Sequence, residues 1–218
     1  NMSLVARGVN MKNVKKGKTG GTTGVPVIVY KDTFNRSFTW ASYYRWYEWM
    51  GINYYDKSAT FWGARTVTKK STRKMIVDSL TCFVQNDLKI NTFTLSEKNK
   101  WDIYKKLLGF KPLILKGYLS ALLDIAEFFD RNHLPGINPQ VLSSTTETLL
   151  PHHREYLTRI FKAPIYDQYG CGELSAISYE CKAHNGLHVN QEHIICEILD
   201  DNNQPVIDIS GKVVGTDL

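Results

Sequence analysis

The sequence predicts an α/β fold: a doubly wound, mostly parallel sheet with a small antiparallel β subdomain at the C-terminal end. Between residues 27 and 169, short apolar or alternating segments take turns with amphipathic helical segments, and such short connections are typical of parallel βαβ units. After Tyr169, strand-like segments follow one another without helices, separated by turn residues such as "DDNNQP". We therefore expect two domains, residues 1–168 and residues 169–218.

Each predicted element has its own pattern. Strands are predicted where residues alternate or are apolar over a short run, and helices where apolar residues recur every three to four positions after a capping residue. The predicted strands are 25–32, 88–95, 111–118, 139–145, 163–170, 176–181, 186–191, 193–200 and 212–218. The predicted helices are 34–50, 97–108, 119–132 and 151–161, whereas residues 75–84 are too short and mixed to assign. Ser96 is expected to cap the second of these helices, and Pro151 to lie near the first turn of the fourth. The third helix is expected to carry one apolar stripe, formed by Leu119, Leu122, Ala126 and Phe129.

Composition excludes several classes of protein. A chain of 218 residues with 43% hydrophobic and 12% aromatic residues forms a globular core rather than a disordered chain. It shows neither an apolar run long enough for a membrane span nor a signal peptide, so membrane insertion is not expected. Four scattered cysteines do not resemble a disulfide framework, which favours a cytoplasmic location. The net charge is +6, but the basic clusters lack a nucleic-acid-binding motif, so nucleic acid is not an expected partner.

A glycine-rich segment, "KGKTGGTTGVPVIVY" at residues 16–30, is the first candidate site. Small residues let backbone N–H groups converge on phosphate oxygens, while threonines and lysines add donors and charge. It is not a Walker loop, because Lys12 stands where that motif needs glycine and because a strand, not a helix, follows. On its own the segment is either a plain turn or a phosphate-binding loop.

Two further polar clusters follow predicted parallel strands. In "YDQYGCGELS", Tyr169 can stack on a flat ring, Gly170 and Gly172 allow close backbone approach, and Glu173 can bind Mg²⁺. In "LSSTTETLL", four polar residues end another strand: Ser144, Thr145, Thr146 and Glu147. Because parallel strands end at one sheet edge, we expect these clusters to converge there.

The order of these motifs resembles the adenylate-forming enzyme superfamily. The segments "KTGGTTGVP", "SSTTETL" and "YDQYGCGE" resemble the superfamily as a whole. "ILKGYLSAL" and "EC" followed by "GLHV" are most similar to the phenylacetate-coenzyme A ligase and capsular polysaccharide biosynthesis (CapK-like) family. The likeness runs from about Lys16 to the end. It implies an incomplete large domain of the ANL type, with residues 1–168 as the nucleotide-binding portion and 169–218 as a β-rich subdomain truncated at its C-terminus.

The resemblance implies an activity and residue roles. A carboxylic acid, the small-molecule partner, would react with ATP to an acyl-adenylate and then pass to a thiol, commonly coenzyme A. Tyr169 and Gly170 would contact adenine, and Glu173 would hold Mg²⁺ and act in catalysis with Thr22 and Thr23. The ATP phosphates would lie on Thr19, Gly20, Gly21, Thr22, Thr23 and Gly24, and the nucleotide base would be bordered by Ser144, Thr145, Thr146 and Glu147.

Cys181 and His188 resemble half of a four-ligand structural Zn²⁺ site whose other half would lie in a later Cys-x-Cys-Gly element. The alternative is an ordinary buried cysteine and an exposed histidine. Because the sequence stops within a predicted strand at Leu218, we expect a central fragment of an adenylating domain that is inactive or weakly active by itself.

Two questions stay open at this stage. The alternative function is a catalytically silent adenylation-like domain that binds nucleotide within a capsular or exopolysaccharide biosynthesis assembly. The aromatic helix at residues 34–49 either lines an acyl site or belongs to the core. The acid, the final acyl acceptor and the oligomeric state are not predicted.

Overall fold

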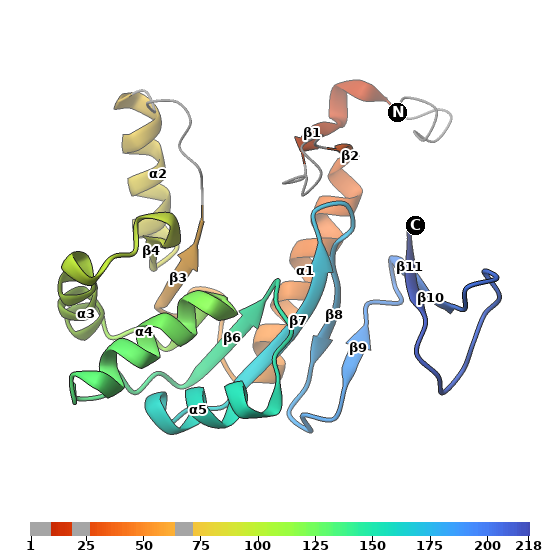
Figure 1. The fold of residues 1–218 in the computed structure, drawn as a ribbon. Coiled ribbons are helices and arrows are strands. Elements are labelled where there is room, and N and C mark those ends of the chain that lie inside the picture. The colour runs from red at the N-terminus through yellow and green to blue at the C-terminus, as the bar shows by residue number, and fades with distance from the viewer. Residues whose placement is uncertain (1–9, 19–26, 64–71) are drawn as a thin grey trace. The chain divides into compact units, whose positions relative to one another are not determined.

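The computed structural model describes residues 10–18, 27–63 and 72–218 (Figure 1). The chain forms two compact units, each described by itself. Unit 1 consists of Asn1–Trp46, Tyr169–Cys181 and Asn185–Leu218, and unit 2 of Tyr47–Gln168 and Lys182–His184. The domain boundary predicted between residues 168 and 169 stays a prediction.

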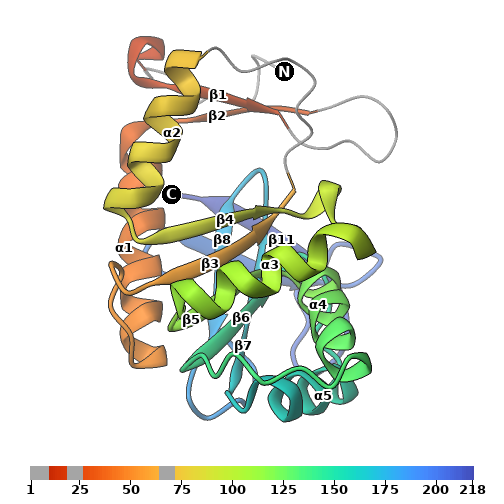
Figure 2. The same cartoon turned by 90° about the vertical axis from the view of Figure 1, so that its left-hand side faces the viewer.

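Five parallel strands lie side by side at the centre of unit 2. They are β3 (Ser58–Trp62), β4 (Asp87–Asn91), β5 (Ile114–Tyr118), β6 (Val141–Thr145) and β7 (Ile165–Cys171), whose last residues belong to unit 1. Their order is β4-β3-β5-β6-β7, and each neighbouring pair is parallel. Figure 2 shows β4 and β3 side by side, with β5, β6 and β7 following below.

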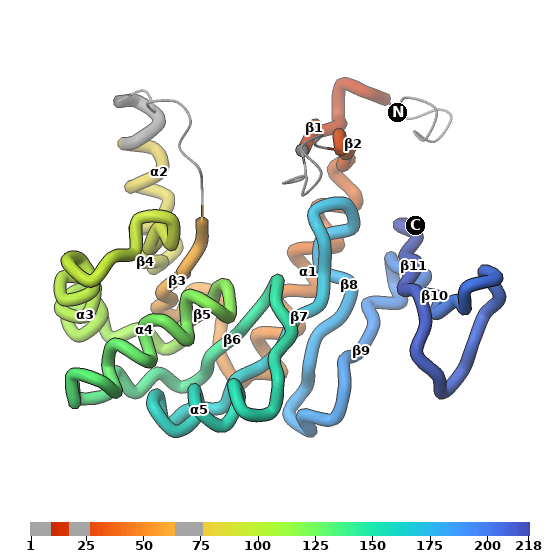
Figure 3. Tube along the Cα trace, in the orientation of Figure 1, coloured from red at the N-terminus to blue at the C-terminus, as the bar shows by residue number. Residues whose placement is uncertain are grey.

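Helices connect these strands, as the tube trace in Figure 3 follows for β5, α4 and β6. They are α2 (Thr72–Val84), α3 (Glu97–Phe110), α4 (Leu119–Arg131) and α5 (Pro151–Phe161), with a short 3-10 turn, η3 (Thr92–Thr94), after β4. Ser96 begins α3 in a capping box, because its backbone N–H donates to Asn99 Oδ1 at 3.0 Å. α5 begins with Pro151. A helix tolerates proline in its first turn because no backbone N–H is needed there as a hydrogen-bond donor.

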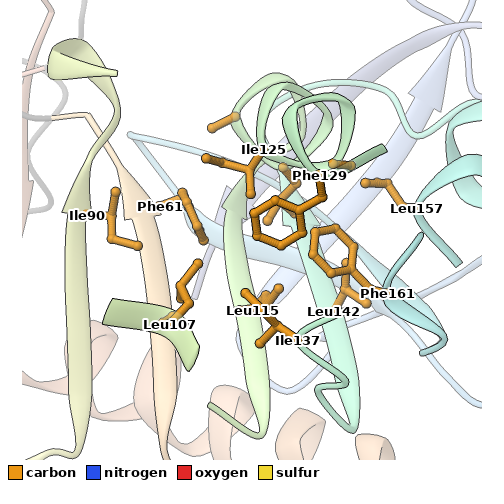
Figure 4. Close-up of a cluster of buried hydrophobic side chains, with 14 of the residues drawn as sticks. Phe61, Ile90, Leu107, Leu115, Ile125, Phe129, Ile137, Leu142, Leu157 and Phe161 are labelled. Carbon is orange, nitrogen blue, oxygen red and sulfur yellow. The ribbon is translucent and has the colours of Figure 1, made fainter. Parts of the chain in front are cut away.

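The core of unit 2 lies between the sheet and the helices α3, α4 and α5. The stripe predicted for α4 is buried as expected: Leu119, Leu122, Ala126 and Phe129. Figure 4 shows Phe129 and Phe161 close together, with ring centroids 5.8 Å apart, above Leu142 of β6. Burying these side chains stabilises the unit by roughly 2 kcal/mol for each large residue.

The opposite face of the sheet in unit 2 carries polar side chains. The hydroxyls of Ser58 and Thr60 donate to Asp87 Oδ1 at 2.7 and 2.6 Å. On β5, Lys116 Nζ donates to the hydroxyl of Tyr47 at 3.2 Å. Burial lowers the pKa of Lys116, and the charge of Asp87 opposes that shift. This face therefore holds a partly buried cation in the middle of the sheet.

Unit 1 contains α1 (Thr33–Met50), whose last turn belongs to unit 2, and three antiparallel strand pairs. The pairs are β1 (Lys15–Lys18) with β2 (Ile28–Lys31), β8 (Ser175–Glu180) with β9 (Leu187–Val189), and β10 (Ile194–Leu199) with β11 (Lys212–Asp217), and the 3-10 helix η2 (Met11–Asn13) precedes them. Asp32 caps α1, because its Oδ1 accepts from the backbone N–H of Asn35 at 2.8 Å. Trp46 stacks on Tyr179 at 4.6 Å between ring centroids.

The predicted α/β class with a mostly parallel sheet and small antiparallel sheets is confirmed. The strand β3 was not predicted, although it lies inside the sheet between β4 and β5. It has only five residues, and Ser58 and Ala59 are both buried, so it lacks the alternation that marks a half-exposed strand. Residues 75–84, which the sequence pattern does not assign, lie in α2. In the described part of the chain, no helix is long and apolar enough to cross a membrane.

Candidate functional site

The carboxyl end of β6 in unit 2 carries the predicted "SSTTETL" cluster, next to Asp167 and Gln168 of β7. Ser144 is fully buried, and its hydroxyl donates to Asp167 Oδ1 at 3.2 Å. The strand register pairs Ser144 with Asp167 and Thr145 with Gln168. Asp167 also accepts a hydrogen bond from the backbone N–H of Gln168 at 2.9 Å. We call the residues 144–147 and 167–168 the polar edge.

Thr146 and Glu147 give the polar edge its shape. Thr146 has φ of +80°, a conformation that costs a β-branched residue of the order of 1–2 kcal/mol. Beside it, the Glu147 carboxylate accepts from both the backbone N–H and the hydroxyl of Ser120, each at 2.7 Å. Ser120 lies in the first turn of α4, where a carboxylate satisfies free backbone donors. Glu147 therefore joins the end of β6 to the start of α4, a contact that the sequence did not predict.

A topological switch point lies between β3 and β5. The strand order β4-β3-β5-β6-β7 means that the chain moves outward from β3 to β4 and then returns past β3 to β5. In open α/β sheets, ligands bind outside the carboxyl ends of the strands at such a point. The last residues of these two strands are Trp62 and Tyr118, with ring centroids 4.5 Å apart. Sequence reasoning missed this pair because it missed β3.

The second predicted cluster lies in unit 1, on β7 and the turn that leads to β8. Tyr169 is 46% exposed, and Glu173 is exposed in the turn. A Cβ added at Gly170 would stand 2.3 Å from the carbonyl oxygen of Ser175. The glycine is therefore required by the chain's own packing, quite apart from any ligand. The backbone N–H of Leu174 donates to the Cys171 sulfur at 3.4 Å.

Lys31, the last residue of β2, belongs to the same part of unit 1. Its ammonium donates to the hydroxyl of Ser175, which has φ of +67° directly after the turn. Burial lowers the pKa of Lys31, and the nearby Cys171, Asp217 and Glu173 act in the opposite direction. Sequence patterns do not single out Lys31, since it lies seven residues beyond Gly24.

The predicted phosphate-binding residues Thr19, Gly20, Gly21, Thr22, Thr23 and Gly24 lie outside the described residues. The strands on either side are described: β1 ends at Lys18, β2 begins at Ile28, and the register pairs these two residues. As expected, a strand and not a helix follows the glycine-rich segment. The roles of these six residues stay predictions.

The predicted metal ligands Cys181, His188 and Glu173 all lie within the described residues. Nowhere in ranges 10–18, 27–63 and 72–218 do three or more His, Cys, Asp or Glu side chains gather as a metal site. The β8–β9 register pairs His188 with Tyr179, two residues before Cys181. Cys181 and His188 are two ligands, half of a tetrahedral set, and the described residues do not complete a Zn²⁺ site around them. A single carboxylate, Glu173, fits the usual way in which Mg²⁺ is held together with substrate phosphates.

The aromatic helix α1 serves the core at its C-terminal half. Trp46 and Tyr47 are buried, and the Trp46 indole N–H donates to the backbone carbonyl of Glu180 at 2.9 Å. Tyr43 also packs against Tyr179, with ring centroids 5.5 Å apart. These three aromatic residues of the helix therefore belong to the core, one of the two roles that the sequence analysis considers for this helix.

Comparison with known proteins places this geometry in context. No family model matches the chain. Protein CapK of Staphylococcus aureus is 27% identical over 165 residues, which are 74% of this chain and 36% of that protein. The chain thus spans about a third of this curated relative and about half or less of the solved structures named below.

Solved structures of CoA ligases share the fold. An open conformation of 2-hydroxyisobutyryl-CoA ligase, in complex with 2-HIB-AMP and CoA, matches with a TM-score of 0.71 at 15% identity, over 96% of this chain and 49% of that chain. A long-chain-fatty-acid-CoA ligase from Archaeoglobus fulgidus matches with 0.64 at 13% identity, over 93% and 41%. A benzoate CoA ligase from Burkholderia xenovorans LB400 matches with 0.63 at 15% identity, over 96% and 41%. The predicted resemblance is confirmed: this chain has the fold of part of an adenylate-forming CoA ligase.

Proposed function

We propose that the chain contributes to an ATP-dependent activation of a carboxylic acid to an acyl-adenylate, followed by transfer of the acyl group to a thiol such as coenzyme A. The observation that carries this proposal is the polar edge, where Thr146 is strained and Glu147 is clamped to Ser120. Backbone strain of this kind persists where the surrounding structure holds it and clusters at ligand sites. Support also comes from the likeness to ligases whose structures contain 2-HIB-AMP.

The proposed reaction depends little on a nucleophile from the protein. A carboxylate oxygen of the acid attacks the α-phosphorus of ATP, the bond from that phosphorus to the bridging oxygen breaks, and pyrophosphate leaves. A thiolate then attacks the acyl carbon and AMP leaves with both electrons of the broken bond. Both steps depend on positioning and on neutralising charge, which preorganised donors and cations supply.

The residue roles follow the sequence resemblance. We propose that Thr19 to Gly24, including Thr22 and Thr23, hold the ATP phosphates and that Glu173 holds Mg²⁺, which would neutralise charge on them. Ser144, Thr145 and Thr146 would border the base, with Tyr169 and Gly170 against adenine. Because both oxygens of Glu147 already accept hydrogen bonds from Ser120, we assign it to holding the edge in shape rather than to contacting the base.

Acid-dependent exchange of pyrophosphate into ATP tests the proposal. The assay uses Mg²⁺, a broad panel of carboxylic acids, this chain and any longer polypeptide that contains it. Glu173→Ala and the double variant Thr22→Ala/Thr23→Ala should each lower exchange by about 10²-fold. Glu155→Ala, an exposed carboxylate on α5, is the matched control and should leave exchange unchanged.

Calorimetry separates this function from its alternative. Binding of ATP and of an acyl-sulfamoyl adenosine without any exchange would indicate a catalytically silent nucleotide-binding domain. A folded protein that shows neither binding nor exchange would refute the proposed function.

A further inference from the structure

A row of polar side chains crosses the sheet of unit 2 on the face opposite the core. The strand register places Thr60 of β3 beside Lys116 of β5, and Lys116 beside Ser143 of β6. Residues in register on parallel strands point to the same face, so these three side chains share one side of the sheet. The residues just before Lys116 and Ser143, Leu115 and Leu142, point the other way and are fully buried in the core. We call Thr60, Lys116 and Ser143 the polar row.

Lys116 brings a positive charge into this row without an ion-pair partner among the described residues. An ammonium group has three N–H donors, and the described residues supply one acceptor, the hydroxyl of Tyr47 at 3.2 Å, whose ring centroid lies 5.6 Å away. The carboxylate whose charge acts on Lys116 is Asp87. Its Oδ1 accepts from the hydroxyls of Ser58 and Thr60 instead, and no ion pair in the described part of the chain joins it to Lys116.

This charge is costly to the fold. Lys116 is half-buried, and burial removes part of the hydration that an ammonium group has in water. The same burial lowers its pKa, while the charge of Asp87 acts in the opposite direction. A methionine of similar length would fill the same space without that cost. Natural proteins keep such a charge mainly at functional sites, so Lys116 is a candidate ligand for an anion.

The polar row lies close to the switch point and to the polar edge. Lys116 precedes Tyr118, the last residue of β5, by two positions, and Ser143 precedes Thr145 of the polar edge by the same interval. A strand rises by about 3.3 Å per residue, so the row lies about 7 Å from the carboxyl ends of these strands. One small molecule about 7 Å long can therefore reach from the polar edge to the polar row.

We propose that Lys116 binds a second carboxylate of the acid, so that dicarboxylic acids are the preferred substrates. This inference rests on the proposed function and names the substrate class of that site. The carboxylate that reacts with ATP lies at the carboxyl ends of the strands, and the second one accepts hydrogen bonds from the Lys116 ammonium and the Ser143 hydroxyl. Ser143 is 6% exposed, so water competes little for its hydroxyl. A hydrogen bond to a charged group adds about ten- to a hundredfold in affinity.

Acid binding without nucleotide gives the test. Ligand-observed NMR titration of this chain measures the dissociation constants of succinate, glutarate and adipate, each beside its own monomethyl ester. Each ester is close to its parent acid in length and carries one negative charge fewer. The diacid whose length fits the site should bind about tenfold more tightly than its ester. This preference should disappear in Lys116→Met and persist in Lys116→Arg, which keeps the charge.

A matched variant and a competition experiment complete the test. Lys105 is exposed on α3, which packs on the opposite face of the sheet, so Lys105→Met removes the same charge elsewhere and should keep the preference. Equal affinity of every diacid and its ester for the natural chain, or a preference that survives Lys116→Met, overturns the proposal. Competitive displacement of the diacid by Mg-ATP also overturns it, because Lys116 then holds a phosphate group. Urea denaturation checks that Lys116→Met is folded, as expected when a partly buried charge is removed.

Failure of this inference is distinct from failure of the proposed function. Pyrophosphate exchange with monocarboxylic acids, and no diacid preference in binding, would overturn the substrate class alone. A diacid preference that depends on Lys116, without any pyrophosphate exchange, would support the binding site while refuting the activity.

Discussion

Replacing Glu147 by alanine removes the contact that joins β6 to α4. The side chain accepts two hydrogen bonds from Ser120, each at 2.7 Å, one of them from a backbone N–H in the first helical turn. Losing a helix N-terminal cap costs about 0.5–2 kcal/mol, and a bond to a charged group about 1.5–3 kcal/mol when buried. Because Glu147 is exposed, solvent screening reduces the second figure. We expect Glu147→Ala to lower the free energy of unfolding by about 1–2 kcal/mol.

Urea denaturation followed by circular dichroism measures this loss, and thermal unfolding should show a Tm lower by about 4 °C. A double-mutant cycle with Ser120→Ala isolates the hydroxyl contact, for which we expect a coupling energy of about 0.5–1 kcal/mol. Glu155→Ala, which removes an exposed carboxylate from α5, should change stability by less than about 0.5 kcal/mol. A Glu147→Ala variant as stable as the natural chain, with no coupling to Ser120, would refute the assigned clamp.

Three further perturbations test other parts of unit 2 by urea denaturation. Gly117→Ala should lower the free energy of unfolding by about 3 kcal/mol or more, because the added Cβ meets the carbonyl oxygen of Phe61 at 2.1 Å in the middle of the sheet. An effect below about 1 kcal/mol would show that β3 and β5 separate easily. Thr146→Asn should stabilise by about 0.5–1 kcal/mol, because asparagine tolerates positive φ better than a β-branched residue; a loss of stability would contradict the strain. Lys116→Met should stabilise by about 1 kcal/mol at neutral pH, since it removes a partly buried charge. Burial lowers the folded-state pKa of Lys116, so the natural chain gains stability as pH rises through that pKa toward the ordinary value of 10.5. The difference in the free energy of unfolding between the natural chain and Lys116→Met should therefore narrow. A difference that stays constant between about pH 7 and 10 would contradict this.

Much of the fold follows from local sequence patterns. The stripe on α4, the cap at Ser96, the proline that begins α5 and the antiparallel segments after Tyr169 are all local features, and each has the expected structure. Local patterns of this kind do not need knowledge of distant partners. The parallel class follows in turn, because helices that alternate with short strands leave few other arrangements.

Local sequence patterns do not predict β3. Its five residues are covered on both faces except near Trp62, so neither alternation nor a long apolar run distinguishes it from a loop. Because β3 lies between β4 and β5, missing it hides the order of the sheet and the switch point with it. The Glu147–Ser120 contact joins residues 27 positions apart and depends on that order as well.

The missed strand also changes the chemical interpretation of the site. Without β3, the sheet edge offers hydroxyls and carboxylates alone, which suits the nucleotide half of an acyl-adenylate. With β3 in place, Trp62 lies beside Tyr118 and near Phe93, so the same edge gains apolar ring surface next to the polar residues. A reaction that joins a polar phosphate to an organic acid needs both surfaces within the reach of one small molecule. The order β4-β3-β5-β6-β7 places the rings at the ends of β3 and β5 next to the polar edge on consecutive strands.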